Sequence, residues 1–250
     1  MAILNEEAIK NVVIAGNIIY KIFSMIEKMD LKGMKTIELN DIIDNKIREN
    51  NALPAFYNYR GFPKSVCISL NEEVVHGIPD SRVIKEGDLV KIDIGVKYNG
   101  YIADAARTFI VGKVPQEAAR LVAVTKEALK KGINVAKCGN RISDISLAIQ
   151  EFVEKNGFSV VRELTGHGVG RELHEDPMIP NFVWNGPDPE IVSGMVLAIE
   201  PMVNSGGFRV KTAANGWTIL TCDRSLSCHF EDTVIILEKG NLNVTRVSEG

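Results

Sequence analysis

The sequence LVKIDIGVKYNGYIADAARTFIV, residues 89–111, carries the strongest structural signal in this chain of 250 residues. Two runs rich in apolar and β-branched residues flank Asn99-Gly100, the dipeptide that best tolerates the positive φ angles of a tight hairpin turn. We therefore predict an antiparallel hairpin with a two-residue loop. In that register Asp93 and Asp104 are diagonal neighbours on one face of the hairpin, roughly 7–8 Å apart at Cα.

Two carboxylates in an apolar sheet repel each other and lose solvation, so they need a shared proton, a basic partner or metal ions. The alternative is that one aspartate faces water and the other accepts hydrogen bonds from nearby backbone. The hairpin by itself leaves both interpretations open.

Composition excludes several classes of protein. A hydrophobic content of 45% is ordinary for a globular core, and a net charge of −3 with a pI near 5.9 gives no reason to expect nucleic acid or a membrane as the main partner. Residues 1–28 have acidic side chains near the start and helical spacing, which indicates an amphipathic helix and not a signal peptide. The four cysteines are widely spaced, which argues against a zinc ribbon or a disulfide framework and fits a reducing cytosol.

Four helices are expected around the hairpin. The first is predicted to begin near Asn5, and the third after Pro115. The second is predicted to begin near residue 41, with Asn40 or Asp41 as its cap. The fourth is predicted to begin near residue 145, with Ser143-Asp144 as its cap, and to stop at Gly157.

Features of the first half recur in the same order in the second half. LNDI at 39–42 matches ISDI at 142–145, the HxxP of His76 matches that of His174, and Asp93 matches Glu200, each six residues after a glycine. We infer an internal duplication. The expected fold is a single α+β domain over 1–250, with pseudo-twofold-related halves at roughly 1–112 and 113–250, each a helix pair plus an antiparallel hairpin, and a site between them.

The duplication gives four carboxylates within apolar strands, and His167 lies between two glycines where we expect close approach to an ion or substrate. The carboxylates are Asp93, Asp104, Glu200 and Glu231. This set is too rich in oxygen for one structural zinc and suits two divalent ions, of Mn, Fe(II), Co or Zn. Such a pair supports hydrolysis of a carbonyl.

Other interpretations apply to the remaining candidates. GHGVG at 166–170 lacks the spacing of a dinucleotide fingerprint. His76 and His174 are either hydrogen-bonded loop residues or, as repeat-related positions, uncoordinated donors at the site. Four further residues are either core or pocket: Tyr59, Phe62, Cys67 and Trp217.

The chain resembles the type I methionine aminopeptidases of the pita-bread fold along nearly its whole length. The resemblance rests on GFPKSVCISLNEEVVHGIP, VKIDIG, GYIADAARTF, GHGVGRELHEDP, MVLAIEPM, NGWTILTCDRSLS and FEDT. It implies two metal ions, with Asp104 and Glu231 bridging both, Asp93 on one, and His167 with Glu200 on the other.

The same resemblance implies a mechanism and partners. A metal-bridging hydroxide would attack the first peptide carbonyl while Glu200 moves the proton and His174 stabilises the oxyanion. His76 would form a hydrogen bond with the scissile amide or with the emerging amine. Four residues would hold the methionine side chain of a nascent or short peptide: Tyr59, Phe62, Cys67 and Trp217. A cytoplasmic monomer without specific nucleic-acid or membrane binding is expected, with the ribosome as a further candidate partner.

Two departures from the family pattern stand out. His229 occupies a position where many members have Gln, and we expect it to border the site for the second substrate residue and affect tolerance there. Phe56 replaces a frequent Cys. Two other functions stay open on the same fold: a peptidase that cleaves before proline or a creatinase-like amidinohydrolase, and a non-catalytic binding module.

Overall fold

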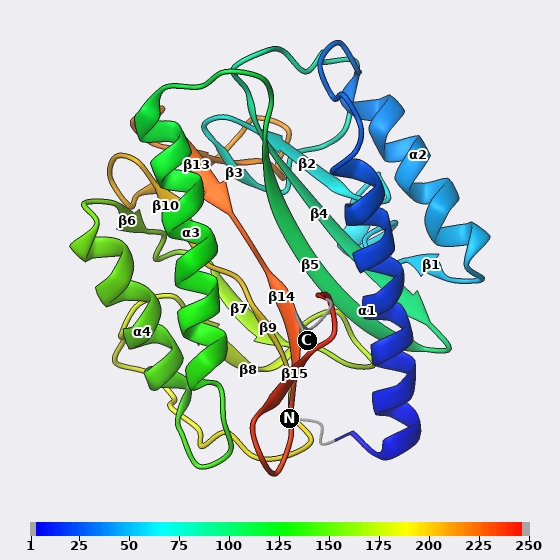
Figure 1. The fold of residues 1–250 in the computed structure, drawn as a ribbon, viewed down its shortest axis with the longest axis vertical. Coiled ribbons are helices and arrows are strands. Elements are labelled where there is room, and N and C mark those ends of the chain that lie inside the picture. The colour runs from blue at the N-terminus through cyan, green and yellow to red at the C-terminus, as the bar shows by residue number, and fades with distance from the viewer. Residues whose placement is uncertain (1–3, 247–250) are drawn as a thin grey trace.

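Two long antiparallel strands lie at the centre of the structure, a computed structural model that describes residues 4–246 (Figure 1). Strand β4 (Leu89–Tyr98) pairs with β5 (Tyr101–Ile110) along its full length, and the turn between them has φ angles of 47° at Asn99 and 84° at Gly100. Asp93 lies opposite Ala106, and Gly95 lies opposite Asp104. The predicted hairpin and its register are therefore confirmed.

The described strands form four sheets, and the strands within them pair antiparallel. The first sheet carries β5 on one edge of β4 and, on the other edge, β1 (Leu53–Pro54) and β2 (Cys67–Leu70). The second has the order β15 (Asn241–Asn243), β14 (Asp232–Ile236), β9 (Val196–Ile199), β7 (Thr165–Gly168) and β8 (Glu175–Pro180). Two smaller sheets consist of β13 (Ser227–His229), β10 (Met202–Asn204) and β6 (Ser159–Val160), and of β11 (Val210–Thr212), β12 (Ile219–Thr221) and β3 (Glu73–Val75).

Two helix pairs cover the sheets on one side, as Figure 1 shows. They are α1 (Glu6–Ile26) with α2 (Thr36–Glu49), and α3 (Gln116–Val135) with α4 (Ile142–Lys155); η1 (Tyr59–Gly61) is a short 3-10 turn. The apolar face of α1 packs on β4 and β5 in one core, and α3 and α4 form a second core with the five-stranded sheet. By length and composition α1 could cross a membrane, but half of its most apolar window is buried in the fold. These helices and antiparallel sheets confirm the predicted α+β class.

The predicted start of α1 is confirmed, because Asn5 Oδ1 accepts a hydrogen bond from the Ala8 amide at 2.9 Å. The predicted caps of α2 and α4 are wrong. These helices begin earlier, and their N-cap residues are Lys35 and Arg141, whose own backbone amides donate to Glu38 and Asp144 in the first turn.

Asn40 lies inside α2, where its side-chain oxygen accepts a hydrogen bond from the Ser65 amide at 3.1 Å. Glu38 in α2 and Asp144 in α4 hold the same position in the first turn of their helices. The predicted match of LNDI with ISDI, which pairs Asp41 with Asp144, is therefore off by about one helical turn. The predicted stop at Gly157 is confirmed, because α4 ends at Lys155 and Gly157 has a φ of 78°.

The two large sheets meet where β5 lies beside the start of β14, which we call the β5–β14 seam. The backbones of Ala106 and Glu231 exchange two hydrogen bonds, of 3.0 and 3.3 Å. Two residues further along each strand, the Thr233 hydroxyl accepts from the Asp104 amide at 2.9 Å and donates to the Asp104 carbonyl at 2.7 Å. The seam fixes both acidic strands relative to each other.

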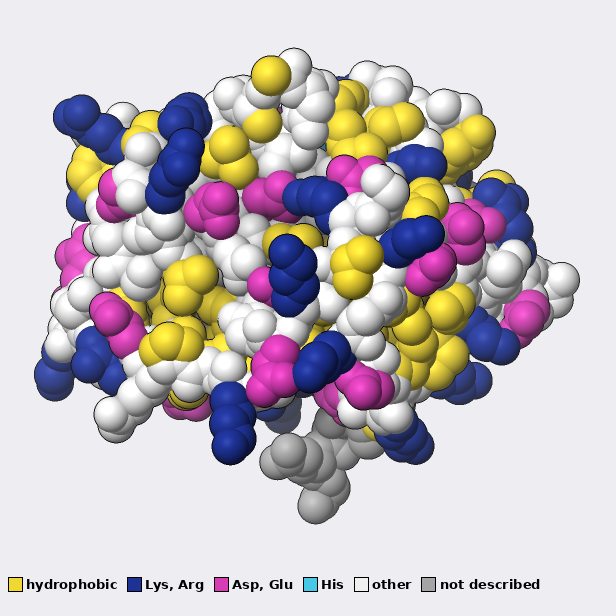
Figure 2. Space-filling view, turned by 90° about the horizontal axis from the view of Figure 1, so that it is seen from above, with side chains coloured by type: hydrophobic (Ala, Val, Ile, Leu, Met, Phe, Trp, Pro, Cys, Tyr) yellow, Lys and Arg dark blue, Asp and Glu magenta, His cyan; other side chains and the backbone are white. Residues whose placement is uncertain are grey.

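Charges on the surface are mixed in sign. On the face seen in Figure 2, Lys and Arg side chains of the described residues alternate with Asp and Glu side chains. Such a distribution lacks the continuous positive field that draws nucleic acid to a protein surface.

Candidate active site

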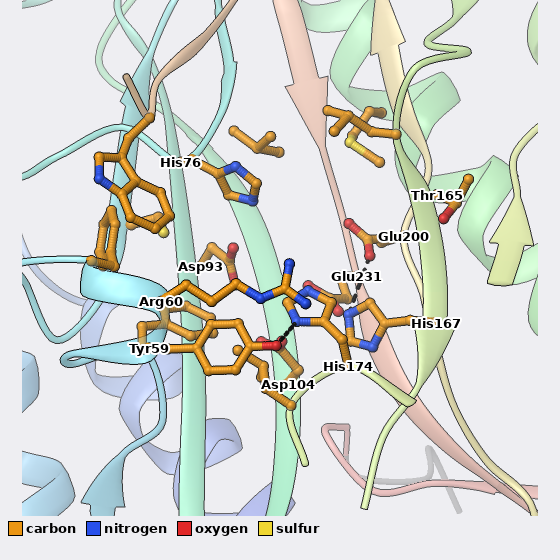
Figure 3. A pocket seen from close by; sticks show the side chains of 18 of the residues that line it. Tyr59, Arg60, His76, Asp93, Asp104, Thr165, His167, His174, Glu200 and Glu231 are labelled. Atoms are coloured by element: carbon orange, nitrogen blue, oxygen red, sulfur yellow. Dashed lines mark hydrogen bonds and ion pairs between the residues drawn. The ribbon is translucent and has the colours of Figure 1, made fainter. Parts of the chain in front are cut away.

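A cavity of about 300 Å³ opens on the side of the strands away from the helices (Figure 3). The structure brings the predicted metal ligands, the two histidine donors and the four pocket residues into the lining of this cavity: Tyr59, Phe62, Cys67, His76, Asp93, Asp104, His167, His174, Glu200, Trp217 and Glu231. They come from both large sheets and from the loops between them, so the cavity lies across the β5–β14 seam.

The four carboxylates reach the cavity because of their places in the two sheets. Asp93 and Asp104 share the inner face of the hairpin, as the register requires. Glu200 directly follows β9 and Glu231 directly precedes β14, and these two strands pair with each other. Asp104 is 4% exposed and Glu231 is 2% exposed, so the acids lie in an environment that penalises charge.

Burial raises the pKa of all four carboxyl groups. It raises the pKa of Asp104 to about 7, and it raises the pKa values of Asp93 and Glu231 well above the usual range, with the neighbouring Asp104 carboxylate adding to the effect. The pKa of Glu200 rises well above the usual range for the same two reasons. Among the described residues, the ion-pair partners of these acids are histidines and no Lys or Arg.

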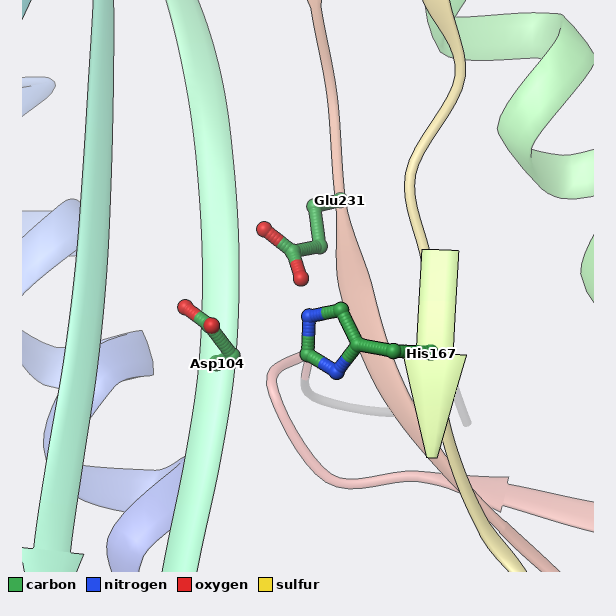
Figure 4. Close-up of side chains that lie close together, drawn as sticks. All are labelled: Asp104, His167 and Glu231. Carbon is green, nitrogen blue, oxygen red and sulfur yellow. The ribbon is translucent and has the colours of Figure 1, made fainter. Parts of the chain in front are cut away.

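The donor atoms of this cluster fit divalent cations. The buried oxygens Asp93 Oδ1, Asp104 Oδ1 and Glu231 Oε1 have no hydrogen-bond partner, although buried polar atoms usually have one. Ligand atoms of Asp104, His167 and Glu231 lie within 4.8 Å of one another, and Figure 4 shows the three side chains close together. A cation there would satisfy the orphaned oxygens and remove the repulsion between the acids.

His167, on β7, is oriented as a metal-binding imidazole. Its Nδ1 contacts the Gly168 carbonyl at 2.9 Å, and its Nε2 lies 3.5 Å from Glu200 Oε1. Burial lowers the pKa of His167 to about 3, so the ring is neutral and Nε2 has a free lone pair when Nδ1 carries the proton.

We expected the glycines around His167 to allow close approach to an ion or substrate, and this expectation is wrong. A Cβ on Gly166 would lie 2.4 Å from the Ala198 carbonyl oxygen, and a Cβ on Gly168 would lie 2.3 Å from the Asp176 carbonyl oxygen. These glycines therefore allow β7 to pack against neighbouring backbone, which fixes the imidazole from behind and does not open space for a ligand.

His76 and His174 lie on opposite sides of the cavity. His174 Nδ1 lies 2.8 Å from the Tyr59 hydroxyl, and its ring is 4.3 Å from the ring of His167, centroid to centroid. Burial lowers the pKa of His76 to about 4 and also lowers the pKa of His174. Both rings are therefore neutral at pH 7, and a neutral imidazole donates one hydrogen bond.

Aromatic side chains enclose one end of the cavity. The rings of Phe62 and Trp217 meet edge to face with centroids 5.2 Å apart, and Cys67 pairs across the strands with Asp93. This places an apolar wall directly beside the carboxylate cluster.

Several lining residues were not predicted from the sequence. Thr165 lines the cavity two residues before His167 on β7, so the alternation of faces along a strand was a usable signal for it. Met202 also lines the cavity, at the start of β10. Phe56 also lines it and packs over Gly95, where an added Cβ would lie 2.6 Å from the Phe56 ring. Arg60 extends across the cavity in Figure 3 from a backbone with a φ of 49°, which no local pattern indicates.

His229 is not where the sequence suggested. It is 1% exposed and is not part of the lining of the cavity, so the expectation that it borders a site for the second substrate residue is wrong. It lies behind the glutamates, with Nε2 3.4 Å from Glu200 Oε2 and 4.0 Å from Glu231 Oε2.

Comparison with known proteins gives the family. Residues 10–238 match the model of metallopeptidase family M24. A methionine aminopeptidase of Clostridium acetobutylicum is 49% identical over 239 residues, which are 95% of this chain and 96% of that protein. The crystal structure of a methionine aminopeptidase from Thermotoga maritima superposes with a TM-score of 0.96 at 41% identity, covering 98% of this chain and 99% of that one. A prolidase from Pyrococcus furiosus superposes with a TM-score of 0.79 at 26% identity, covering 99% of this chain but 66% of that one.

The chain therefore belongs to metallopeptidase family M24, and its fold is the pita-bread fold. The relatives that it matches over nearly the whole of both chains carry the name methionine aminopeptidase. Membership of this family means that the chain uses divalent metal, which agrees with the orphaned oxygens at the seam.

Proposed function

We propose that this chain is a metal-dependent aminopeptidase that removes the initiator methionine from new polypeptides. The observation that carries this function is the position of the buried carboxylate and imidazole cluster at one end of an aromatic cavity of about 300 Å³. An apolar cavity of this size suits one unbranched thioether side chain. The chain hydrolyses peptides at the N-terminal methionine, in agreement with its family and its relatives.

We propose that two divalent ions bind at the seam, of Co, Mn, Fe(II) or Zn. Five residues would hold them: Asp93, Asp104, His167, Glu200 and Glu231. When bound, such ions supply Lewis acidity toward a carbonyl oxygen and lower the pKa of a water molecule. The unpartnered oxygens of three of these residues support the assignment.

The chain's own residues then orient the peptide and move protons. Glu200 is the proposed proton carrier, because its carboxylate lies at the edge of the cluster and lines the cavity. When the Tyr59 hydroxyl donates to His174 Nδ1, the proton of His174 is on Nε2, which can donate to the oxygen of the scissile carbonyl. His76, across the cavity, is the proposed donor to the scissile amide.

The methionine side chain would lie between Tyr59, Phe62, Cys67 and Trp217, which keep water away from it. We further propose a single catalytic domain made of two duplicated halves, acting as a cytoplasmic monomer on nascent or short peptides, with the ribosome as a candidate partner. The helix pair and sheet on each side of the seam support the duplication.

The testing experiment is release of free methionine from a Met-Ala-Ser peptide by chelator-stripped protein, with Mn, Fe(II), Co or Zn restored one at a time. Release that depends on the added metal is expected. The Asp104→Asn variant is the matched control, because it keeps the side-chain shape and removes one proposed bridging carboxylate. No release with any metal, from protein shown to be folded, would contradict the proposal.

Activity on X-Pro dipeptides without activity on the Met-Ala-Ser peptide would favour the prolidase-like function instead. Absence of micromolar metal binding would favour the non-catalytic binding module.

A further inference from the structure

His229 is a buried imidazole whose two ring nitrogens have no hydrogen-bond partner in the protein. Its Nε2 faces the carboxylates of Glu200 and Glu231, at 3.4 and 4.0 Å. The ligand atoms of these three residues lie within 4.8 Å of one another, and they form a second group of donors that shares Glu231 with the group around His167.

The position of His229 is fixed by its backbone. The His229 amide donates to Thr108 Oγ1 at 3.1 Å, the Thr108 hydroxyl donates to the His229 carbonyl at 2.7 Å, and the residue pairs with Met202 across β13 and β10. These contacts fix the backbone from which the imidazole extends toward the glutamates.

The contact with Glu200 does not have the geometry of a hydrogen bond, since Nε2 remains without a partner at a separation of 3.4 Å. An imidazole nitrogen and a carboxylate oxygen that share one cation, each about 2.0–2.2 Å from it, are naturally separated by such a distance. The group at His229 thus has the spacing of co-ligands.

We propose that His229 is a further metal ligand, which binds through Nε2 the ion that Glu200 and Glu231 hold. This inference rests on the proposed metal centre and adds a second imidazole to it. Unlike Nδ1 of His167, which contacts a carbonyl oxygen, Nδ1 of His229 has no protein acceptor. We therefore expect His229 to be the weaker of the two nitrogen ligands, because an acceptor on the second nitrogen makes the first more basic.

The test is proton NMR of the cobalt-loaded protein, in which each cobalt-bound imidazole gives one strongly shifted, exchangeable N–H resonance. We expect two such resonances in the unmodified protein and one in His229→Gln, which keeps a polar side chain but removes the imidazole. Cys228→Ser, on the same strand but directed at Thr108, is the matched control and should keep both.

Metal competition with a chelator gives a second measurement that does not depend on turnover. His229→Gln should bind cobalt at least about tenfold more weakly than the unmodified protein. One shifted resonance in the unmodified protein, or two in His229→Gln, would overturn the assignment of His229 while leaving the proposed function intact. No bound cobalt in the unmodified protein would overturn both.

Discussion

Replacing Thr233 by valine tests how the β5–β14 seam holds the acidic strands together. The Thr233 hydroxyl makes two hydrogen bonds to the backbone of Asp104, one as acceptor at 2.9 Å and one as donor at 2.7 Å. Thr233 is fully buried, so water cannot replace the lost hydroxyl. Valine has nearly the same shape, and the substitution therefore removes two hydrogen bonds without leaving a large cavity.

The expected loss of stability follows from the two groups left without a partner. An unsatisfied buried donor or acceptor costs about 1–3 kcal/mol, so the Asp104 amide and carbonyl together predict a loss of about 2–6 kcal/mol in the free energy of unfolding. Thr125→Val is the control, because Thr125 is equally buried but its hydroxyl donates at 2.8 Å to the Leu121 carbonyl within α3. That carbonyl keeps its helical hydrogen bond, and the control should lose less than about 1 kcal/mol.

The assay is urea unfolding of the metal-free proteins, compared by midpoint at unchanged dependence on urea. A Thr233→Val protein within about 0.5 kcal/mol of the unmodified protein, or no less stable than Thr125→Val, would refute this account of the seam.

Three further predictions concern the buried charges. Asp104→Asn and Glu231→Gln should each abolish turnover while the fold survives, and near-normal turnover in either would contradict their proposed bridging role. Metal-free Glu231→Gln should also melt at a higher temperature than the unmodified protein near pH 8 but not near pH 4. Folding raises the pKa of Glu231, so the folded state is destabilised at a pH where the carboxyl group of the unfolded chain is ionised, and not at a pH where it is protonated in both states. Burial lowers the pKa of Lys91 from 10.5 to about 8, so the folded state releases this proton before the unfolded state does. The free energy of unfolding of the unmodified protein, relative to that of Lys91→Met, should therefore rise by about 3 kcal/mol between pH 8 and 10.5. A difference between the two proteins in urea unfolding that does not change with pH would disprove this prediction.

The central hairpin could be predicted in detail because its information is local. A two-residue turn at Asn99-Gly100 fixes which residues are opposite each other, and the side-chain period of two then fixes the common face of Asp93 and Asp104. To predict that these acids lie close to Glu200 and Glu231, the internal repeat was needed as well, since no local pattern relates strands so far apart in the chain.

The predictions of the α2 and α4 caps were wrong for a reason that is also local. Asn and Asp are the usual capping residues, but Lys35 and Arg141 precede the helices here, and the first-turn acids Glu38 and Asp144 accept from their backbone amides. The glycines beside His167 and the direction of His229 depend on which strands pack behind them. That is tertiary information, which composition and spacing do not contain.

The position of the donors on both sides of the seam has a consequence for how the chain matures. Asp93 and Asp104 come from one large sheet and His167 from the other, so the complete metal centre forms only when the two sheets have docked at the seam. By mass action the metal then stabilises only the docked state, by about 4 kcal/mol when its free concentration is a thousand times the dissociation constant. Chelation should accordingly speed unfolding of the protein, so metal supply controls the lifetime of the enzyme in addition to its turnover.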